Sequence, residues 1–265
     1  MIFSANKKRL LNELQSFVAE KKIWEQLGVE DPLWAVVSSD KQQGGKWDRN
    51  EFFETGEKDV ARYHEILRKS LGYGTRLGRL LDFGCGVGRL TLAWSQRAEE
   101  VVGIDVSAPM IELAKSNLHD VPNAQVLLND STTLSQFTSD SFDVITSHIC
   151  LQHIPQQFTP TYIAEFGRIC RSRGAVIFQL PSRSRSLQIF PKIRSWIVEN
   201  APFGLGSLYR RFKGGSAVRF KVHCMPSEVV IALAEKAGLN LISIESDESA
   251  GKNLLSYIYV FQKTH

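Results

Sequence analysis

The residues best suited to chemistry form one glycine-rich segment, Leu80-Leu81-Asp82-Phe83-Gly84-Cys85-Gly86-Val87-Gly88-Arg89. An apolar run ends there, three alternating glycines follow, and a helix-like stretch begins. Glycines let the backbone approach a ligand closely, and the N-terminus of a helix offers N–H groups and the positive end of a dipole. The segment therefore predicts a nucleotide-type site at the carboxyl end of a strand.

The spacing of the glycines indicates which nucleotide fits. A dinucleotide fingerprint needs glycines at relative positions 1, 3 and 6, but Arg89 stands at the sixth position here. Asp82 comes two residues before the first glycine, and a phosphate site has little use for a carboxylate. A ligand that carries a cationic sulfonium and an ammonium group suits it better.

Two further acidic positions end the next apolar runs. Asp105 lies 21 residues after Gly84, at the tip of the second run, where a carboxylate can accept hydrogen bonds from both ribose hydroxyls. The segment Asn129-Asp130-Ser131 ends the third run. A carboxylate at Asp130 can meet an adenine amino group there.

Short apolar runs that alternate with helix-like stretches must position these residues. The runs predicted as strands buried on both faces are 80–83, 101–105, 124–128, 142–147 and 175–180, and the helical stretches lie near 88–98, 107–118, 132–137 and 157–170. This alternation predicts a mostly parallel sheet covered by helices. A helix near 226–237 and two strands, 239–245 and 254–262, close the chain. Too few residues separate these two strands for a crossover helix, so they should be antiparallel to each other.

Five segments in order resemble the signatures of the class I S-adenosylmethionine-dependent methyltransferases: DFGCGVG, VVGIDVS, LLNDS, FDVITSHICLQHI and GRICRSRGAVIFQLP. The resemblance covers residues of about 75–181 and 225–262. It implies an α/β, Rossmann-like doubly wound sheet of seven strands in the order 3-2-1-4-5-7-6, with the last strand antiparallel. One departure is Arg171-Ser172-Arg173-Gly174, where the family usually has Lys-Pro-Gly-Gly.

The resemblance also implies a cofactor, S-adenosyl-L-methionine, which becomes S-adenosyl-L-homocysteine, and a set of residues that bind it. Asp82 and the three glycines fall at its methionine end, Asp105 at its ribose, and Asp130 and Ser131 at its adenine edge. The complete predicted set is Asp82, Gly84, Cys85 (through its backbone N–H), Gly86, Gly88, Asp105, Val106, Met110, Asp130, Ser131 and Ser147.

Two histidines follow the fourth predicted strand, where acceptors meet the methyl group in this family. A hydroxyl acceptor benefits from a positioned base, so His148 and His153 are the candidate catalytic residues. The alternative is that they pack or orient the loop. The candidate substrate contacts are Trp47, Phe53, Arg219 and His223.

Two regions lie outside the shared core. The first 27 residues predict an amphipathic helix, and the loop-like residues 28–58 carry aromatic side chains that either pack on the core or form a lid. With a helix expected near 58–70, we predict an N-terminal helical cap at 1–72 and a methyltransferase domain at 73–265. Within that domain, an insertion after the fifth strand, 182–222, holds nine basic residues and one acid. It predicts a cover for an acidic or hydrophobic acceptor; weak contact with a membrane surface and an ordinary solvated surface are the alternatives.

Composition excludes several other classes. The chain has 265 residues, 43% of them hydrophobic, and a net charge of +4, which is too small to argue for nucleic acid. Four scattered cysteines form no metal-ligand spacing, and no run is long enough to span a bilayer. We expect a cytoplasmic small-molecule methyltransferase without a metal, acting on oxygen or nitrogen. The alternatives are an RNA or protein methyltransferase and a non-catalytic module that binds S-adenosylmethionine. The sequence does not indicate an oligomeric state.

Overall fold

One seven-stranded sheet organises the chain. The computed structural model describes residues 2–39, 41–185 and 221–264. The strands are β1 (Leu77–Phe83), β2 (Ala98–Asp105), β3 (Ala124–Leu128), β4 (Phe142–Ser147), β5 (Cys170–Ser184), β6 (Leu239–Asp247) and β7 (Leu254–Lys263). Their order is β3-β2-β1-β4-β5-β7-β6, and β7 runs antiparallel to both of its neighbours. The predicted topology is therefore confirmed.

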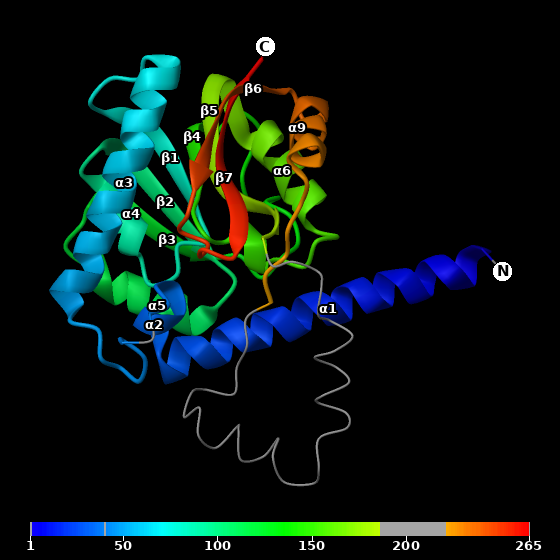
Figure 1. Ribbon diagram of the computed structural model, residues 1–265, viewed down its shortest axis with the longest axis horizontal. Helices are drawn as coiled ribbons and strands as arrows, with labels where there is room; N and C mark the ends of the chain where they lie inside the picture. The colour runs from blue at the N-terminus through cyan, green and yellow to red at the C-terminus, as the bar shows by residue number, and fades with distance from the viewer. Residues whose placement is uncertain (1, 40, 186–220, 265) are drawn as a thin grey trace, which may run out of the picture.

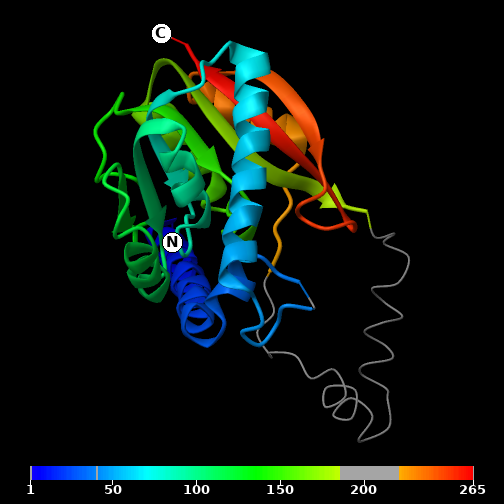
Figure 2. The ribbon, with the colours of Figure 1, turned by 90° about the vertical axis from the view of Figure 1, so that its left-hand side faces the viewer.

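Helices cover both faces of this sheet (Figures 1 and 2). The helical elements are α1 (Ile2–Glu30), α2 (Pro32–Val36), α3 (Arg49–Leu71), α4 (Arg89–Ser95), α5 (Ala108–Asn117), the 3-10 turn η1 (Leu151–His153), α6 (Thr159–Ile169) and α9 (Ser227–Lys236). Side chains of α3 and α4 pack into one buried cluster with the sheet, and those of α6 and α9 pack into another. None of the helices in the described part of the chain is long and apolar enough to cross a membrane.

Helix α1 crosses one edge of the domain, along the bottom of Figure 1, and its N-terminal part extends beyond the rest of the fold. Its C-terminal part is anchored: Leu27 is buried with Phe52 of α3, Val87 of the glycine segment and Met110 of α5. This packing holds α1 and α3 against the carboxyl ends of β1 and β2, where the predicted site lies.

Helix α3 begins nine residues before the predicted start near Lys58, so Phe52 and Phe53 are helical rather than part of a loop. Asp48 caps its N-terminus by accepting a hydrogen bond from the backbone N–H of Glu51 at 3.0 Å. Glycine and charged residues in this stretch obscure the helical spacing of its apolar residues. Burial of Phe52 supplies the tertiary support that the local pattern does not reveal.

Two other sequence predictions are wrong. The segment 132–137 forms turns instead of a helix, because the hydroxyl of Ser131 accepts a hydrogen bond from the backbone N–H of Thr133 and offers the backbone a local alternative. Strand β3 is only partly buried, not covered on both faces, because it is an edge strand of the sheet.

Candidate active site

A cavity of about 590 Å³ lies at the carboxyl ends of β1, β2 and β4. The glycine loop forms its floor with Gly84 and Gly86, and the residues that follow β2 and β4 form its sides. Helices α1 and α3 cover it, contributing Trp24 and Asp59. The sheet and the N-terminal helices therefore enclose one space.

The glycine loop needs its glycines for conformation and for close packing. Gly84, Gly86 and Gly88 have positive φ angles of 81°, 54° and 86°, a region that residues with a Cβ adopt at a cost. A Cβ on Gly84 would also overlap the side chain of Cys150, and one on Gly86 would come within 2.8 Å of Val36. Any side chain at these positions would disturb the cavity floor.

The N–H groups of this loop are already used within the chain. The backbone nitrogens of Gly84 and Cys85 both donate to the carbonyl oxygen of Ile104, at 2.8 and 2.9 Å. The N–H of Gly86 donates to the carboxylate of Asp105 at 2.9 Å. The predicted use of the Cys85 N–H for a ligand is therefore corrected, because the end of β2 takes that donor.

Asp105 lines the cavity beside Val106 and Met110, as the sequence predicts. One carboxylate oxygen accepts from Gly86, and the other accepts from the backbone N–H of Ser107 at 2.9 Å. Burial raises the pKa of this carboxyl above its ordinary value, and the hydrogen bonds from Ser107 and Gly86 oppose that shift. Because a carboxylate has about four acceptor sites, Asp105 keeps acceptor capacity for a donor on a ligand.

At the end of β3 the structure favours Asn129 over the two predicted residues. Asn129 lines the cavity, and its buried side-chain oxygen has no hydrogen-bond partner among the described residues. The side chain of Asp130 is 64% exposed and lies 3.7 Å from Lys21, while Ser131 is engaged with Thr133 and Tyr162. Leaving a buried acceptor unpaired costs about 1–3 kcal/mol, so the Asn129 oxygen is a good position for a ligand's donor.

Three predicted cofactor residues support the loop from outside the cavity lining. The buried carboxylate of Asp82 accepts a hydrogen bond from the hydroxyl of Thr91 at 2.7 Å, and burial raises the pKa of Asp82 to about 6. Gly88 begins α4 and packs against Leu118. Ser147 is buried at the end of β4. The cavity lining does not include these three residues, and their direct contact with a cofactor stays a prediction.

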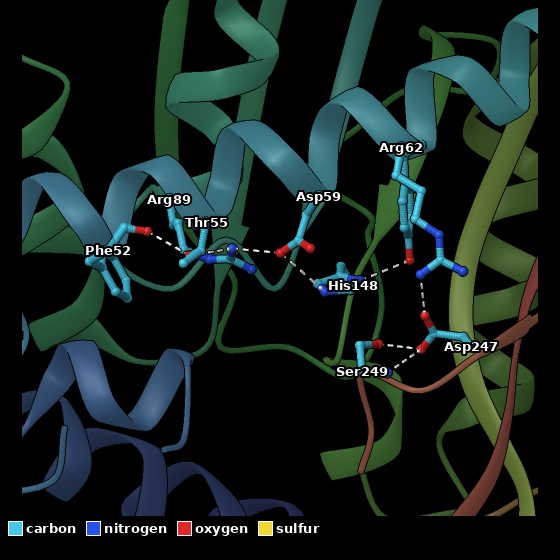
Figure 3. A network of polar contacts seen from close by, with 9 residues as sticks. Phe52, Thr55, Asp59, Arg62, Arg89, His148, Asp247 and Ser249 are labelled. Atoms are coloured by element: carbon cyan, nitrogen blue, oxygen red, sulfur yellow. Dashed lines mark hydrogen bonds and ion pairs between the residues drawn. The ribbon is translucent and has the colours of Figure 1, made fainter. Parts of the chain in front are cut away.

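His148 lines the cavity within a polar network (Figure 3). Its Nδ1 lies 3.0 Å from the Tyr63 hydroxyl, and its Nε2 lies 3.5 Å from a carboxylate oxygen of Asp59. The same oxygen pairs with the guanidinium of Arg89 at 2.6 Å. Burial lowers the pKa of His148 to about 4, so the ring is neutral at pH 7.

His153 also lines the cavity, next to α1. Its Nδ1 lies 3.0 Å from the carbonyl oxygen of Lys221, and its Nε2 lies 3.1 Å from the side-chain nitrogen of Gln152. The indole of Trp24 meets the ring edge-on at 5.2 Å between centroids. Burial also lowers the pKa of His153 to about 4. The arrangement ties η1 to the chain that precedes α9.

Three of the four predicted substrate contacts, Trp47, Phe53 and His223, lie outside the cavity lining. The indole of Trp47 donates to the carbonyl oxygen of Val37, and Phe53 packs edge-on against Phe52. Both residues are partly buried and pack against the apolar cluster that holds α2 and α3 together. His223 donates its backbone N–H to Gln152 at 2.7 Å and lies outside the cavity lining. Arg219 and most of the basic insertion lie outside the described residues.

Sequence reasoning missed Thr55, Asp59 and Tyr63 of α3 and Arg89 of α4. The three α3 residues are spaced i, i+4, i+8, so they share one face of the helix. A helix predicted from the correct start would have revealed this polar stripe. In the sequence, Arg89 stands out only because it breaks the dinucleotide pattern.

Residues 81–178 match the family model described as a methyltransferase domain. A ubiquinone biosynthesis O-methyltransferase of Saccharophagus degradans is 29% identical over 130 residues, which are 48% of this chain and 53% of that protein. A demethylmenaquinone methyltransferase of Staphylococcus aureus is 29% identical over 136 residues, 49% of this chain and 55% of that protein. The chain thus spans about half the length of the curated relatives it matches.

Solved structures show the same fold at low sequence identity. An N-methyltransferase, NodS of Bradyrhizobium japonicum in complex with S-adenosyl-L-homocysteine, has a TM-score of 0.58 at 16% identity, over 93% of this chain and 99% of that one. A magnesium protoporphyrin IX methyltransferase from Synechocystis, with the same molecule bound, has a TM-score of 0.57 at 16% identity, over 88% and 93% of the two chains.

Proposed function

Because residues 81–178 match the model of a methyltransferase domain and the sheet has the strand order of the class I methyltransferase fold, we propose that the protein transfers a methyl group from S-adenosylmethionine to an oxygen or nitrogen of a small molecule. The cofactor, when bound, supplies the activated methyl group. The residues of the chain bind it, orient the acceptor and exclude water.

The observation that carries the proposal is the chemistry of the cavity wall. The N–H groups of Gly84, Cys85 and Gly86 are consumed within the chain, while the acceptors of Asp105 and Asn129 are available to a ligand. This set suits a ligand that donates hydrogen bonds, and it gives a phosphate little to bind. The ribose hydroxyls and the adenine amino group of S-adenosylmethionine are donors of this kind.

In this proposal the cofactor lies at the end of the cavity where Asp105 and Asn129 are found. The remaining acceptor capacity of Asp105 would take the ribose hydroxyls, and the amide oxygen of Asn129 would take the adenine amino group. Val106 and Met110 would flank the adenine ring. Asp82 would act through the glycine loop that it supports from beneath.

The other end of the cavity belongs, in this proposal, to the acceptor. His148 and His153 line it as neutral rings, together with apolar side chains that include Ile149, Ile154 and Val222. The cavity volume lies within the range of roughly 300–1,000 Å³ that is typical of small-molecule sites. The quinone methyltransferases among the relatives also support a small acceptor.

We further propose that residues 1–72 close the site. Phe17 and Trp24 of α1, Val36 of α2 and Asp59 of α3 all line the cavity. A site enclosed by these helices accommodates a small acceptor more readily than a folded RNA or protein.

Calorimetry tests the cofactor assignment directly. S-adenosylmethionine and S-adenosylhomocysteine should both bind with micromolar affinity, and NAD, the control, should give no heat of binding. Binding of NAD with no binding of the other two would refute the assignment. Transfer of labelled methyl groups to small-molecule, RNA and protein fractions then distinguishes the acceptor classes. Cofactor binding without transfer to any fraction would favour a non-catalytic module.

A further inference from the structure

The proposed reaction gives no role to Asp59, a carboxylate in the cavity wall. It lines the cavity from α3, and its side chain is 32% exposed although both groups that pair with it are buried. Asp59 Oδ2 takes both internal contacts, with Arg89 and with His148. Among the described residues, Asp59 Oδ1 has no hydrogen-bond or ion-pair partner.

The carboxylate of Asp59 is held in place by its neighbours (Figure 3). The Arg89 guanidinium, 4% exposed, donates to Asp59 at 2.6 Å and to the hydroxyl of Thr55 at 3.0 Å. That hydroxyl in turn donates to the carbonyl oxygen of Phe52 at 2.6 Å. The chain therefore fixes Oδ2 and leaves Oδ1 in a defined position.

The surroundings of His148 indicate which group can receive a proton or hydrogen bond from an acceptor. A carboxylate oxygen faces Nε2, which favours the tautomer with the proton on Nε2. The Tyr63 hydroxyl, which burial keeps protonated, then donates to Nδ1 at 3.0 Å. The only lone pair of the neutral ring is thus already occupied, and His148 serves to hold Asp59.

The rest of α3 is fixed against the sheet on the other side of His148. Arg62 pairs with the buried Asp247 at the end of β6, at 2.7 Å, and Asp247 accepts a hydrogen bond from the backbone N–H of Ser249. Ser249 also lines the cavity. Helix α3, which carries Asp59, is therefore bound to α4 through Arg89 and to β6 through Asp247.

We propose that Asp59 determines acceptor specificity: its Oδ1 accepts a hydrogen bond from a hydroxyl or amine group carried by an otherwise apolar acceptor. The inference rests on the proposed function, because it places the acceptor beside His148. The apolar body of such an acceptor would pack among Val37, Ile149 and Val222, which line the same cavity.

The test uses matched probes on the full chain saturated with S-adenosylhomocysteine. One pair is 2-naphthol and 2-methoxynaphthalene, and the second is 4-methylphenol and 4-methylanisole; each pair differs in the hydroxyl donor. Calorimetry should show that the wild-type protein binds the hydroxyl member of at least one pair about 10-fold more tightly, as expected for one hydrogen bond to a charged group. In Asp59→Asn this preference should fall below about twofold.

Glu57→Gln is the matched control, because Glu57 lies on the same helix and pairs with Arg97 outside the cavity lining. It should keep the full hydroxyl preference. Asp59→Glu preserves the charge opposite Arg89 while displacing the carboxylate, so it repeats the comparison if the amide variant does not fold; it too should lose the preference.

The outcomes separate the two proposals. Failure of wild-type protein to bind S-adenosylhomocysteine contradicts the proposed function. If that molecule binds but neither probe pair shows a hydroxyl preference, only the role of Asp59 is overturned. A hydroxyl preference that persists in the Asp59 variants also overturns the role proposed for Asp59.

Discussion

The carboxylate of Asp105 accepts a hydrogen bond from the backbone N–H of Gly86 at 2.9 Å, so the end of β2 holds the glycine loop that follows β1. Its other oxygen takes the N–H of Ser107 at the start of α5. One side chain therefore organises three successive segments around the cavity. This arrangement explains why the N–H of Gly86 is not free to bind a ligand.

Replacing Asp105 should weaken cofactor binding more than it weakens the fold. In Asp105→Asn the amide nitrogen cannot accept, so either a backbone donor or a ribose hydroxyl loses its partner. The affinity for S-adenosylhomocysteine should drop about 10- to 100-fold, the equivalent of roughly 1.5–3 kcal/mol for hydrogen bonds to a charged group. Asp120→Asn, at an exposed site after α5, is the calorimetric control. Equal affinities of the two variants would contradict the ribose assignment.

Asp82 should make the protein less stable above pH 6. Burial raises its pKa in the folded protein to about 6, from an ordinary value of 3.8. Between these pH values the folded state binds more protons than the unfolded state, so the free energy of unfolding falls as the pH rises. The full effect, on the order of 3 kcal/mol, is present above pH 6 and absent below about pH 4.

Asp82→Asn removes this titration but keeps an acceptor for the Thr91 hydroxyl. Urea unfolding at pH 4 should give similar stabilities for the variant and the wild type, and at pH 8 the variant should be more stable by about 3 kcal/mol. The other groups that titrate in this range, including His148 and His153, are common to both proteins and largely cancel in the difference. A variant that is less stable at pH 8 would contradict the prediction.

The two cavity histidines should be neutral and of opposite tautomers. The Asp59 carboxylate favours a proton on Nε2 of His148, whereas the Lys221 carbonyl favours a proton on Nδ1 of His153. Burial lowers both pKa values to about 4, so both rings should remain neutral at pH 5.5. Nitrogen-15 NMR of the imidazole rings, assigned with His148→Gln and His153→Gln, measures both properties. A doubly protonated ring at pH 5.5, or the same tautomer at both positions, would disagree with this geometry.

The topology was predictable because long apolar runs identify buried strands directly. The positions of Asp105, Val106 and Met110 follow from such a run, since they come at its end or start the next helix. Asp59 was not predictable in the same way. Its surroundings depend on Arg89, 30 residues further along the chain, and only the packing of α3 on α4 brings the two together.

The end of β3 shows a second reason for errors. Successive side chains of an extended chain point in opposite directions, so Asn129 enters the cavity while Asp130 faces outward. The charge of Asp130 made it the better candidate in the sequence. The direction of each side chain is fixed by the pairing of β3 with β2, which residue types alone do not specify.

The backbone at Ile149 should be strained, and two substitutions can measure this strain. Ile149 has a φ of 51° between His148 and Cys150, and the left-handed region costs a residue with a Cβ about 1–2 kcal/mol. Ile149→Ala keeps that cost, whereas Ile149→Gly removes it and loses only about 0.4–1 kcal/mol through the greater freedom of the unfolded chain. The glycine variant should therefore be the more stable of the two by about 0.5–1 kcal/mol in urea unfolding. The same pair of substitutions at Leu113, within α5, should give the opposite order, because alanine favours a helix by about 1 kcal/mol over glycine. If alanine is also the more stable at position 149, the loop after β4 does not hold this residue under strain.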